Sequence, residues 1–176
     1  IVEGTAGNTG IGLALIAKEY GMKLKIVIPN TQSKEKKDTL KDYGAELIEV
    51  DAAPYSDPNN YIKISKKISE ELIKSNNSGV LWANQFDNLA NTEAHLQTTA
   101  NEIWTQTAGQ VDGFICAVGT GGTLAGVSIG LKSKNKNIKI GLSDPMGSSL
   151  YNYIKENKLT SSGNSITEGI GTGRIT

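Results

Sequence analysis

Two short stretches of the sequence combine glycine with threonine or asparagine in a way that suits anion binding. The first is TAGNTG at positions 5–10, before an apolar helical run, and the second is GTGGT at 119–123, after the apolar run 111–118. At a helix start the backbone N–H groups are unpaired and carry the positive end of the dipole, and glycine lets a ligand approach them closely. For the first stretch, the alternative that the polar side chains only close a tight turn stays open. In the second, three glycines and two threonines favour a phosphate cradle.

The elements that must position these turns alternate along the chain. Strand-like runs are predicted at 1–3, 24–28, 46–50, 80–83, 111–118 and 138–143, with helical segments between them. Such alternation implies right-handed crossovers and mostly parallel sheet, so we expect an α/β fold in three layers with flanking helices. Ligands of open parallel sheets gather at the carboxyl ends of the strands, where both turns fall.

Two helices are predicted with particular clarity. Apolar residues recur at helical spacing over 61–72, and Asp57 followed by Pro58 resembles an acidic cap with proline in the first turn. A second periodic pattern covers 92–107, and Gly109 follows it as a stop signal.

The overall composition points to a small-molecule partner. The 176 residues carry 18 basic and 18 acidic side chains, so no net field attracts nucleic acid or an anionic membrane. No apolar run approaches the roughly 20 residues needed to span a bilayer. The single cysteine, Cys116, cannot form an internal disulfide, and its apolar surroundings predict a buried thiol in a reducing compartment, the cytoplasm.

The domain organisation is predicted from the weakest division of the chain, the polar stretch 84–91. We expect a smaller substrate-clasping lobe in 1–88 and a lobe that binds the cofactor phosphate in 89–176. The chain opens inside a predicted strand and stops at 174–176 without a closing element, so we expect an internal fragment of a longer protein.

Paired sites for a carboxylate and a phosphate are what a pyridoxal-phosphate enzyme acting on an amino acid requires. The motifs EGTAGNTG at 3–10, NQF at 84–86, the 119–123 loop and EGIG at 168–171 together resemble the fold-type II pyridoxal-phosphate family. The resemblance is closest to the cysteine synthases and cystathionine β-synthases, and it implies the two-lobed fold of the tryptophan synthase β subunit. It also implies a homodimer for the full-length protein.

The resemblance assigns roles to particular residues. The substrate α-carboxylate is expected at Thr5, Ala6, Gly7, Asn8, Thr9 and Gln85. Asn8 is also expected to approach the ring oxygen of pyridoxal 5′-phosphate. The cofactor phosphate is expected at Gly119, Thr120, Gly121, Gly122 and Thr123, with Gly169, Ile170 and Gly171 bordering the site.

The implied reaction is β-replacement on an activated serine to make cysteine, with cystathionine β-synthase-like condensation as the alternative. Ala6 stands where the family usually has serine, which removes a hydroxyl beside the substrate. The Schiff-base lysine of the family belongs upstream of Ile1, so we expect no catalytic residue in this segment and no activity from the segment alone.

Other candidate residues have simpler interpretations. His95, the only histidine, has no cysteine or carboxylate cluster around it and is predicted to be structural or solvent-facing, and no set of residues has metal-ligand spacing. Asp144 supports a rival dinucleotide-binding dehydrogenase, but Leu124 occupies the last glycine position of the Gly-x-Gly-x-x-Gly fingerprint. A non-catalytic protein that kept the pocket is the third hypothesis.

Overall fold

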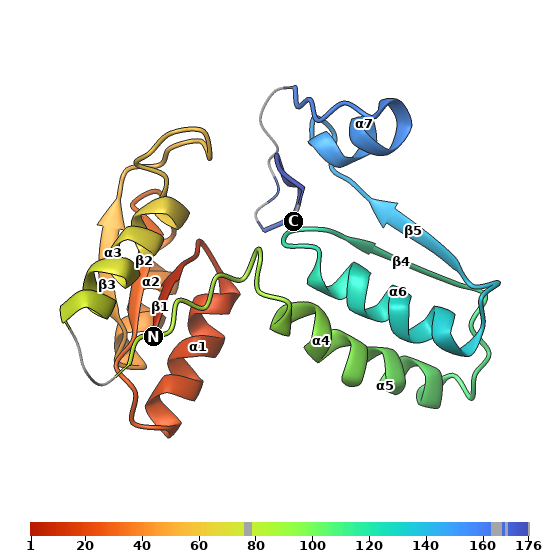
Figure 1. The fold of residues 1–176 in the computed structure, drawn as a ribbon, viewed down its shortest axis with the longest axis horizontal. Helices are drawn as coiled ribbons and strands as arrows, with labels where there is room; N and C mark the ends of the chain where they lie inside the picture. Colours follow the sequence, from red (N-terminus) through yellow and green to blue (C-terminus); the bar gives the residue numbers. More distant parts are fainter. Residues whose placement is uncertain (76–78, 163–166, 168, 176) are drawn as a thin grey trace. The chain divides into compact units, whose positions relative to one another are not determined.

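The computed structural model describes residues 1–75, 79–162, 167 and 169–175. The chain divides into two compact units, Ile1–Gln85 and Phe86–Thr176 (Figure 1). Both units combine parallel strands with helices, which confirms the predicted α/β class. Each unit is described separately below.

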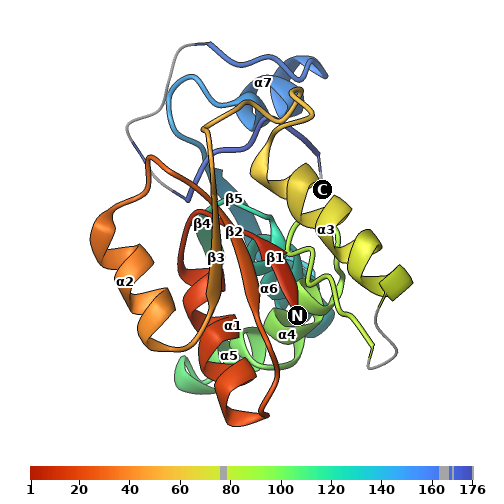
Figure 2. The same ribbon diagram turned by 90° about the vertical axis from the view of Figure 1, so that its left-hand side faces the viewer.

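The first unit contains a parallel sheet in the order β1-β2-β3, with helices on both faces. Its strands are β1 (Val2–Gly4), β2 (Lys25–Pro29) and β3 (Glu46–Val50), and its helices are α1 (Asn8–Glu19), α2 (Lys34–Asp42) and α3 (Tyr61–Ser75). Helices α1 and α2 cover one face of the sheet and α3 covers the other (Figure 2). Within this unit the three layers expected from the sequence are therefore present.

Close packing around the carboxyl end of β1 depends on two glycines. A Cβ on Gly10 of α1 would lie 2.8 Å from Thr5 Cγ2, and one on Gly4 would lie 2.7 Å from the Tyr61 carbonyl oxygen. Ala14, Leu40 and Ile26 are buried together on the α1 side of the sheet. Because these helices pack so tightly, the turn after β1 has little freedom to move.

Two predictions in this unit are wrong in detail. Residues 80–83 form no strand but a single parallel bridge between Trp82 and Val2, and the chain then turns through Asn84 at a φ of 46°. Helix α3 is capped by Asn60, whose Oδ1 accepts the N–H of Ile62 at 3.0 Å, and not by Asp57. Asp57 lies too early to cap the helix, and its Oδ1 accepts the N–H of Asn59 instead.

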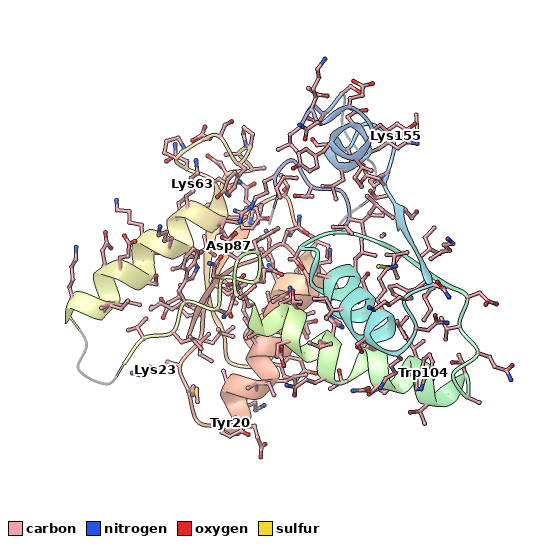
Figure 3. The ribbon with its side chains drawn as sticks, turned by 45° about the vertical axis from the view of Figure 1, so that its right-hand side comes forward. Tyr20, Lys23, Lys63, Asp87, Trp104 and Lys155 are labelled. Carbon is pink, nitrogen blue, oxygen red and sulfur yellow. The ribbon has the colours of Figure 1, made fainter. Side chains whose placement is uncertain are left out.

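The second unit pairs two parallel strands and places its helices around them. The elements are α4 (Ala90–Gln97), α5 (Thr99–Gln106), β4 (Gly113–Ala117), α6 (Gly122–Lys134), β5 (Lys139–Ser143) and α7 (Ser149–Glu156). Asp87 lies ahead of α4, and Trp104 lies toward the far end of α5 (Figure 3). Glycines let α6 approach α4 and α5, because a Cβ on Gly126 would lie 2.3 Å from the Thr92 carbonyl oxygen.

The single helix predicted over 92–107 is broken in two at Thr98, which has φ −106° and ψ −75°. The Thr98 hydroxyl donates to the Ala94 carbonyl at 2.7 Å, a bond that bends helices. The predicted stop is confirmed, since Gly109 has a φ of 75° and its N–H donates to the Trp104 carbonyl.

Cys116 on β4 is only partly buried, contrary to the buried thiol predicted for it, and burial raises its pKa. The two-stranded sheet around it leaves the neighbouring Ile115 68% exposed. Among the described helices, none has the length and apolar character needed to cross a membrane.

Candidate functional site

The turn after β1 presents backbone N–H groups at the start of α1. Thr5 is buried, its N–H donates to the Val27 carbonyl at 3.0 Å, and its Oγ1 accepts the N–H of Gly7 at 3.2 Å. Gly7 occupies the cap position of α1 without a side-chain cap, so it leaves the first N–H groups of the helix open to a ligand. Ala6 is partly buried and Asn8 is exposed at the helix start.

Gln85 lies against this turn, although 76 residues separate it from Thr9. The Thr9 hydroxyl donates to Gln85 Oε1 at 2.6 Å, and Gln85 Nε2 donates to the Gly4 carbonyl at 3.4 Å. The second bond is long, and therefore weak. The fold thus brings the six residues predicted for the substrate carboxylate to one end of β1.

Glu3 lies directly below this turn and was not predicted as a site residue. Its side chain is buried, and its Oε1 accepts the N–H of Gln85 at 3.4 Å. Burial raises the pKa of the Glu3 carboxyl to about 7. The signal that could have revealed Glu3 is a carboxylate inside a strand whose neighbours are apolar or glycine.

The glycine-rich loop lies at the start of α6 in the second unit. Gly121, at a φ of 93°, occupies the cap position, and the helix begins at Gly122. A Cβ on Gly119 would lie 2.3 Å from the Gly169 carbonyl oxygen, and the Gly171 N–H donates to the Val118 carbonyl at 2.7 Å. The loop and the segment Gly169, Ile170 and Gly171 therefore lie together, as predicted for a shared site.

The same segment is anchored a few residues further on. The Arg174 guanidinium forms an ion pair with Asp87 and lies 5.2 Å from the centre of the Phe86 ring. Phe86, the last residue of the NQF motif, therefore contacts the chain three residues beyond Gly171 within the second unit. Glu168, the first residue of the EGIG motif, lies outside the described residues.

Side chains from α4 support both threonines of the glycine-rich loop. Asn91 Nδ2 donates to Thr120 Oγ1 at 2.8 Å, and His95 Nε2 shares a 3.0 Å hydrogen bond with Thr123 Oγ1. His95 Nδ1 shares a second bond, of 2.9 Å, with Thr99 Oγ1. These contacts, which the sequence did not reveal, agree with the structural role predicted for His95.

The residues of this loop fit a phosphate group. Gly119 and Gly122 let the 169–171 segment and Asn91 pack directly against the loop, and two threonine hydroxyls held from α4 add polar groups beside the helix N-terminus. Asp144, the candidate ribose ligand of a dinucleotide fold, has a structural contact instead: its Oδ2 accepts the Tyr151 N–H at 2.9 Å in the first turn of α7. In the described part of the chain, no cluster of side chains could hold a metal ion.

Comparison with known proteins agrees with this geometry. The family model "Pyridoxal-phosphate dependent enzyme" matches residues 1–176. Cysteine synthase 1 of Emericella nidulans is 50% identical over 179 residues, which cover 100% of this chain and 47% of that protein. The chain spans about half the length of the curated relatives it matches.

Solved structures show the same similarity. A cysteine synthase from Entamoeba histolytica is 38% identical with a TM-score of 0.78, covering 97% of this chain and 47% of that one. An O-ureido-L-serine synthase is 30% identical with a TM-score of 0.82, covering 99% of this chain and 51% of that one.

Proposed function

The chain belongs to the family of pyridoxal-phosphate-dependent enzymes, and from that premise we propose that the protein makes cysteine by β-replacement on an activated serine. The observation that carries this proposal is the Thr9–Gln85 hydrogen bond, which joins two distant motifs into one carboxylate-binding turn. The similarity to cysteine synthases supports it. The match to the pyridoxal-phosphate family excludes the dehydrogenase hypothesis.

The turn after β1 binds and orients the amino-acid substrate. The open N–H groups at the start of α1, with the amide of Asn8 and the hydroxyls of Thr5 and Thr9, surround the α-carboxylate. The long bond from Gln85 Nε2 to the Gly4 carbonyl is easily exchanged for a charge-assisted bond to that carboxylate. Substrate orientation is therefore the task of these six residues, with Ala6 and Gly7 contributing backbone.

The glycine-rich loop holds the cofactor through its phosphate. Backbone and hydroxyl donors for the phosphate come from Gly119, Thr120, Gly121, Gly122 and Thr123. The segment Gly169, Ile170 and Gly171 forms one border of the phosphate site. In this proposal, Asn8 contacts the ring oxygen of the cofactor. When bound, pyridoxal phosphate supplies the electron sink that allows a group to leave the substrate β-carbon. The lysine that would anchor the cofactor has no match in this segment.

The nucleophile is sulfide in this proposal, and homocysteine is the competing one. Ala6 removes a hydroxyl from the substrate turn, which makes room for a different activating group on the serine. Assays of the complete protein with an acetylated serine, and with sulfide or homocysteine in turn, decide between the two reactions. Cysteine formation from sulfide supports the proposal, and turnover with homocysteine alone contradicts it.

Further properties of the complete protein are also proposed. We assign 1–88 to a substrate lobe and 89–176 to a cofactor lobe, and we propose a homodimer in a reducing compartment, the cytoplasm. The single cysteine, Cys116, supports a reduced thiol. Light scattering on the complete protein tests the dimer.

The function is tested most directly at the carboxylate turn. In the complete, cofactor-loaded protein, Asn8→Ala and Gln85→Ala should weaken amino-acid binding while the cofactor stays bound, because both amides are proposed to contact the carboxylate. Gln106→Ala is the matched control, since it removes an exposed amide from the end of α5. Unchanged amino-acid affinity in both site variants would refute the assignment.

A further inference from the structure

Glu3 is the most deeply buried ionisable side chain near the candidate site, with 1% of its surface exposed. It lies on β1 between Val2 and Gly4, and among the described residues no cation forms an ion pair with it. Its Oε2 is buried and has no hydrogen-bond partner within the described residues. Burying a carboxyl in this way is costly, so its presence beside a ligand turn calls for a functional explanation.

The Glu3 carboxyl accepts a hydrogen bond from the backbone N–H of Gln85, and contacts with the Asn84 backbone and the Gln85 side chain also favour its charged form. Before this point, residues 81–83 are held to β1, because the Val2 N–H donates to the Leu81 carbonyl and the Ala83 N–H donates to the Val2 carbonyl. The chain then passes through Asn84 at a φ of 46°, a conformation uncommon for residues other than glycine. The Glu3 carboxyl therefore receives the Gln85 N–H just after this turn in the chain.

We propose that Glu3 is a positioning residue of the carboxylate site, which acts through Gln85. The buried Glu3 carboxyl guides the Gln85 backbone through a bond of 3.4 Å, and Gln85 in turn places its side chain between Thr9 and the Gly4 carbonyl. This inference rests on the proposed function, because it assigns Glu3 to the substrate turn described there.

The charge of Glu3 couples this positioning to pH. Because burial raises the pKa of Glu3 to about 7, the carboxyl is neutral in mildly acidic solution and does not repel a substrate carboxylate bound above it. The other titratable group coupled to Glu3 is Tyr61 on α3, whose pKa is raised by burial and by the charge of Glu3, so it stays neutral throughout this range. Amino-acid affinity should therefore fall as pH rises through about 7.

The experiment uses Glu3→Leu and Glu3→Gln in the complete, cofactor-loaded protein. Leucine keeps most of the volume but removes the acceptor, and glutamine keeps a neutral acceptor. We expect Glu3→Leu to raise KM for the amino acid about threefold with little change in kcat, since one long and therefore weak bond to a site group is lost. Glu3→Gln should keep the wild-type KM at low pH and lose the fall in affinity near pH 7, as measured by calorimetric binding.

Two further variants separate the possible outcomes. Gln85→Ala reports on the carboxylate site itself, and Ser65→Ala is the structural control, because the buried Ser65 hydroxyl accepts from Trp82 Nε1 without contacting Gln85. If Gln85→Ala raises KM for the amino acid but Glu3→Leu does not, the positioning role of Glu3 is overturned, and the proposed carboxylate site at the turn after β1 stands. If Gln85→Ala leaves KM unchanged, both are overturned. If Glu3→Leu only lowers the melting temperature, as Ser65→Ala should, the positioning role is again overturned.

Discussion

Thr9 and Gln85, 76 residues apart, are joined by a hydrogen bond of 2.6 Å from the Thr9 hydroxyl to Gln85 Oε1. Thr9 lies in the first turn of α1, whereas Gln85 closes the segment that runs beside β1. A side-chain bond over this separation fixes both partners only when the intervening fold is intact. The turn and the glutamine therefore act as one site.

Thr9→Val should separate the two halves of this site. Valine keeps the shape of threonine but leaves Gln85 Oε1 without the hydroxyl, which costs about 1 to 3 kcal/mol of unfolding free energy and weakens amino-acid binding. Thr9→Ser keeps the hydroxyl and should restore binding. Chemical denaturation and ligand titration measure the two effects, and equal binding by the valine and serine variants would contradict the prediction.

The stability of the protein should depend on pH through Glu3. The pKa of this carboxyl is about 7 in the folded protein and has an ordinary value of 4.5, so between these values the folded state binds more protons than the unfolded state. Unfolding free energy must then fall as pH rises from about 4.5 to about 7, by about 3 kcal/mol in total, and this contribution stays constant at higher pH.

Glu3→Gln removes this titration. Compared with the wild type, the variant should lose less stability between about pH 5 and about pH 8, as followed by urea unfolding at each pH. Asp38→Asn is the control, because the hydrogen bond from Lys34 lowers the pKa of that carboxyl below its ordinary value of 3.8, so Asp38 does not titrate in this pH range. Parallel stability curves for the wild type and Glu3→Gln would show that Glu3 does not titrate in this range.

Gly119→Ala should damage the phosphate loop. The added Cβ would lie 2.3 Å from the Gly169 carbonyl oxygen, so the loop and the 169–171 segment must separate, at a cost of about 1 to 3 kcal/mol. Gly173→Ala is the matched control, since among the described residues, its two chain neighbours aside, no atom lies within 4 Å of a Cβ at that position. Thermal unfolding and cofactor titration should both worsen for Gly119→Ala and change little for Gly173→Ala.

The sequence predicted the two glycine-containing turns, but it did not predict the side chains of α4 that hold the second turn in place. The glycine and threonine patterns at 5–10 and 119–123 are local, so they could be recognised without knowing the fold. The bonds from Asn91 and His95 depend on how closely α4 approaches α6, which glycines such as Gly126 permit. No periodic pattern in one helix indicates which residue of another helix it will contact, and the break at Thr98 was hidden within a continuous apolar repeat.

His95 offers the sharpest test of that support, because its two ring nitrogens join threonines on different elements. One nitrogen bonds Thr123 in the phosphate loop and the other bonds Thr99 at the start of α5, so the ring fixes the loop hydroxyl against the break between α4 and α5.

His95→Ala should free the Thr123 hydroxyl to rotate and weaken cofactor binding about tenfold, the effect of one good hydrogen bond to a charged group. Thr99→Val should have a smaller effect, because it releases only the far side of the ring. Gln106→Ala, at the exposed end of α5, serves as the control, and cofactor absorbance during dialysis provides the measurement. Retention of the cofactor by His95→Ala at the level of the control would show that the backbone of the loop binds the phosphate without help from α4.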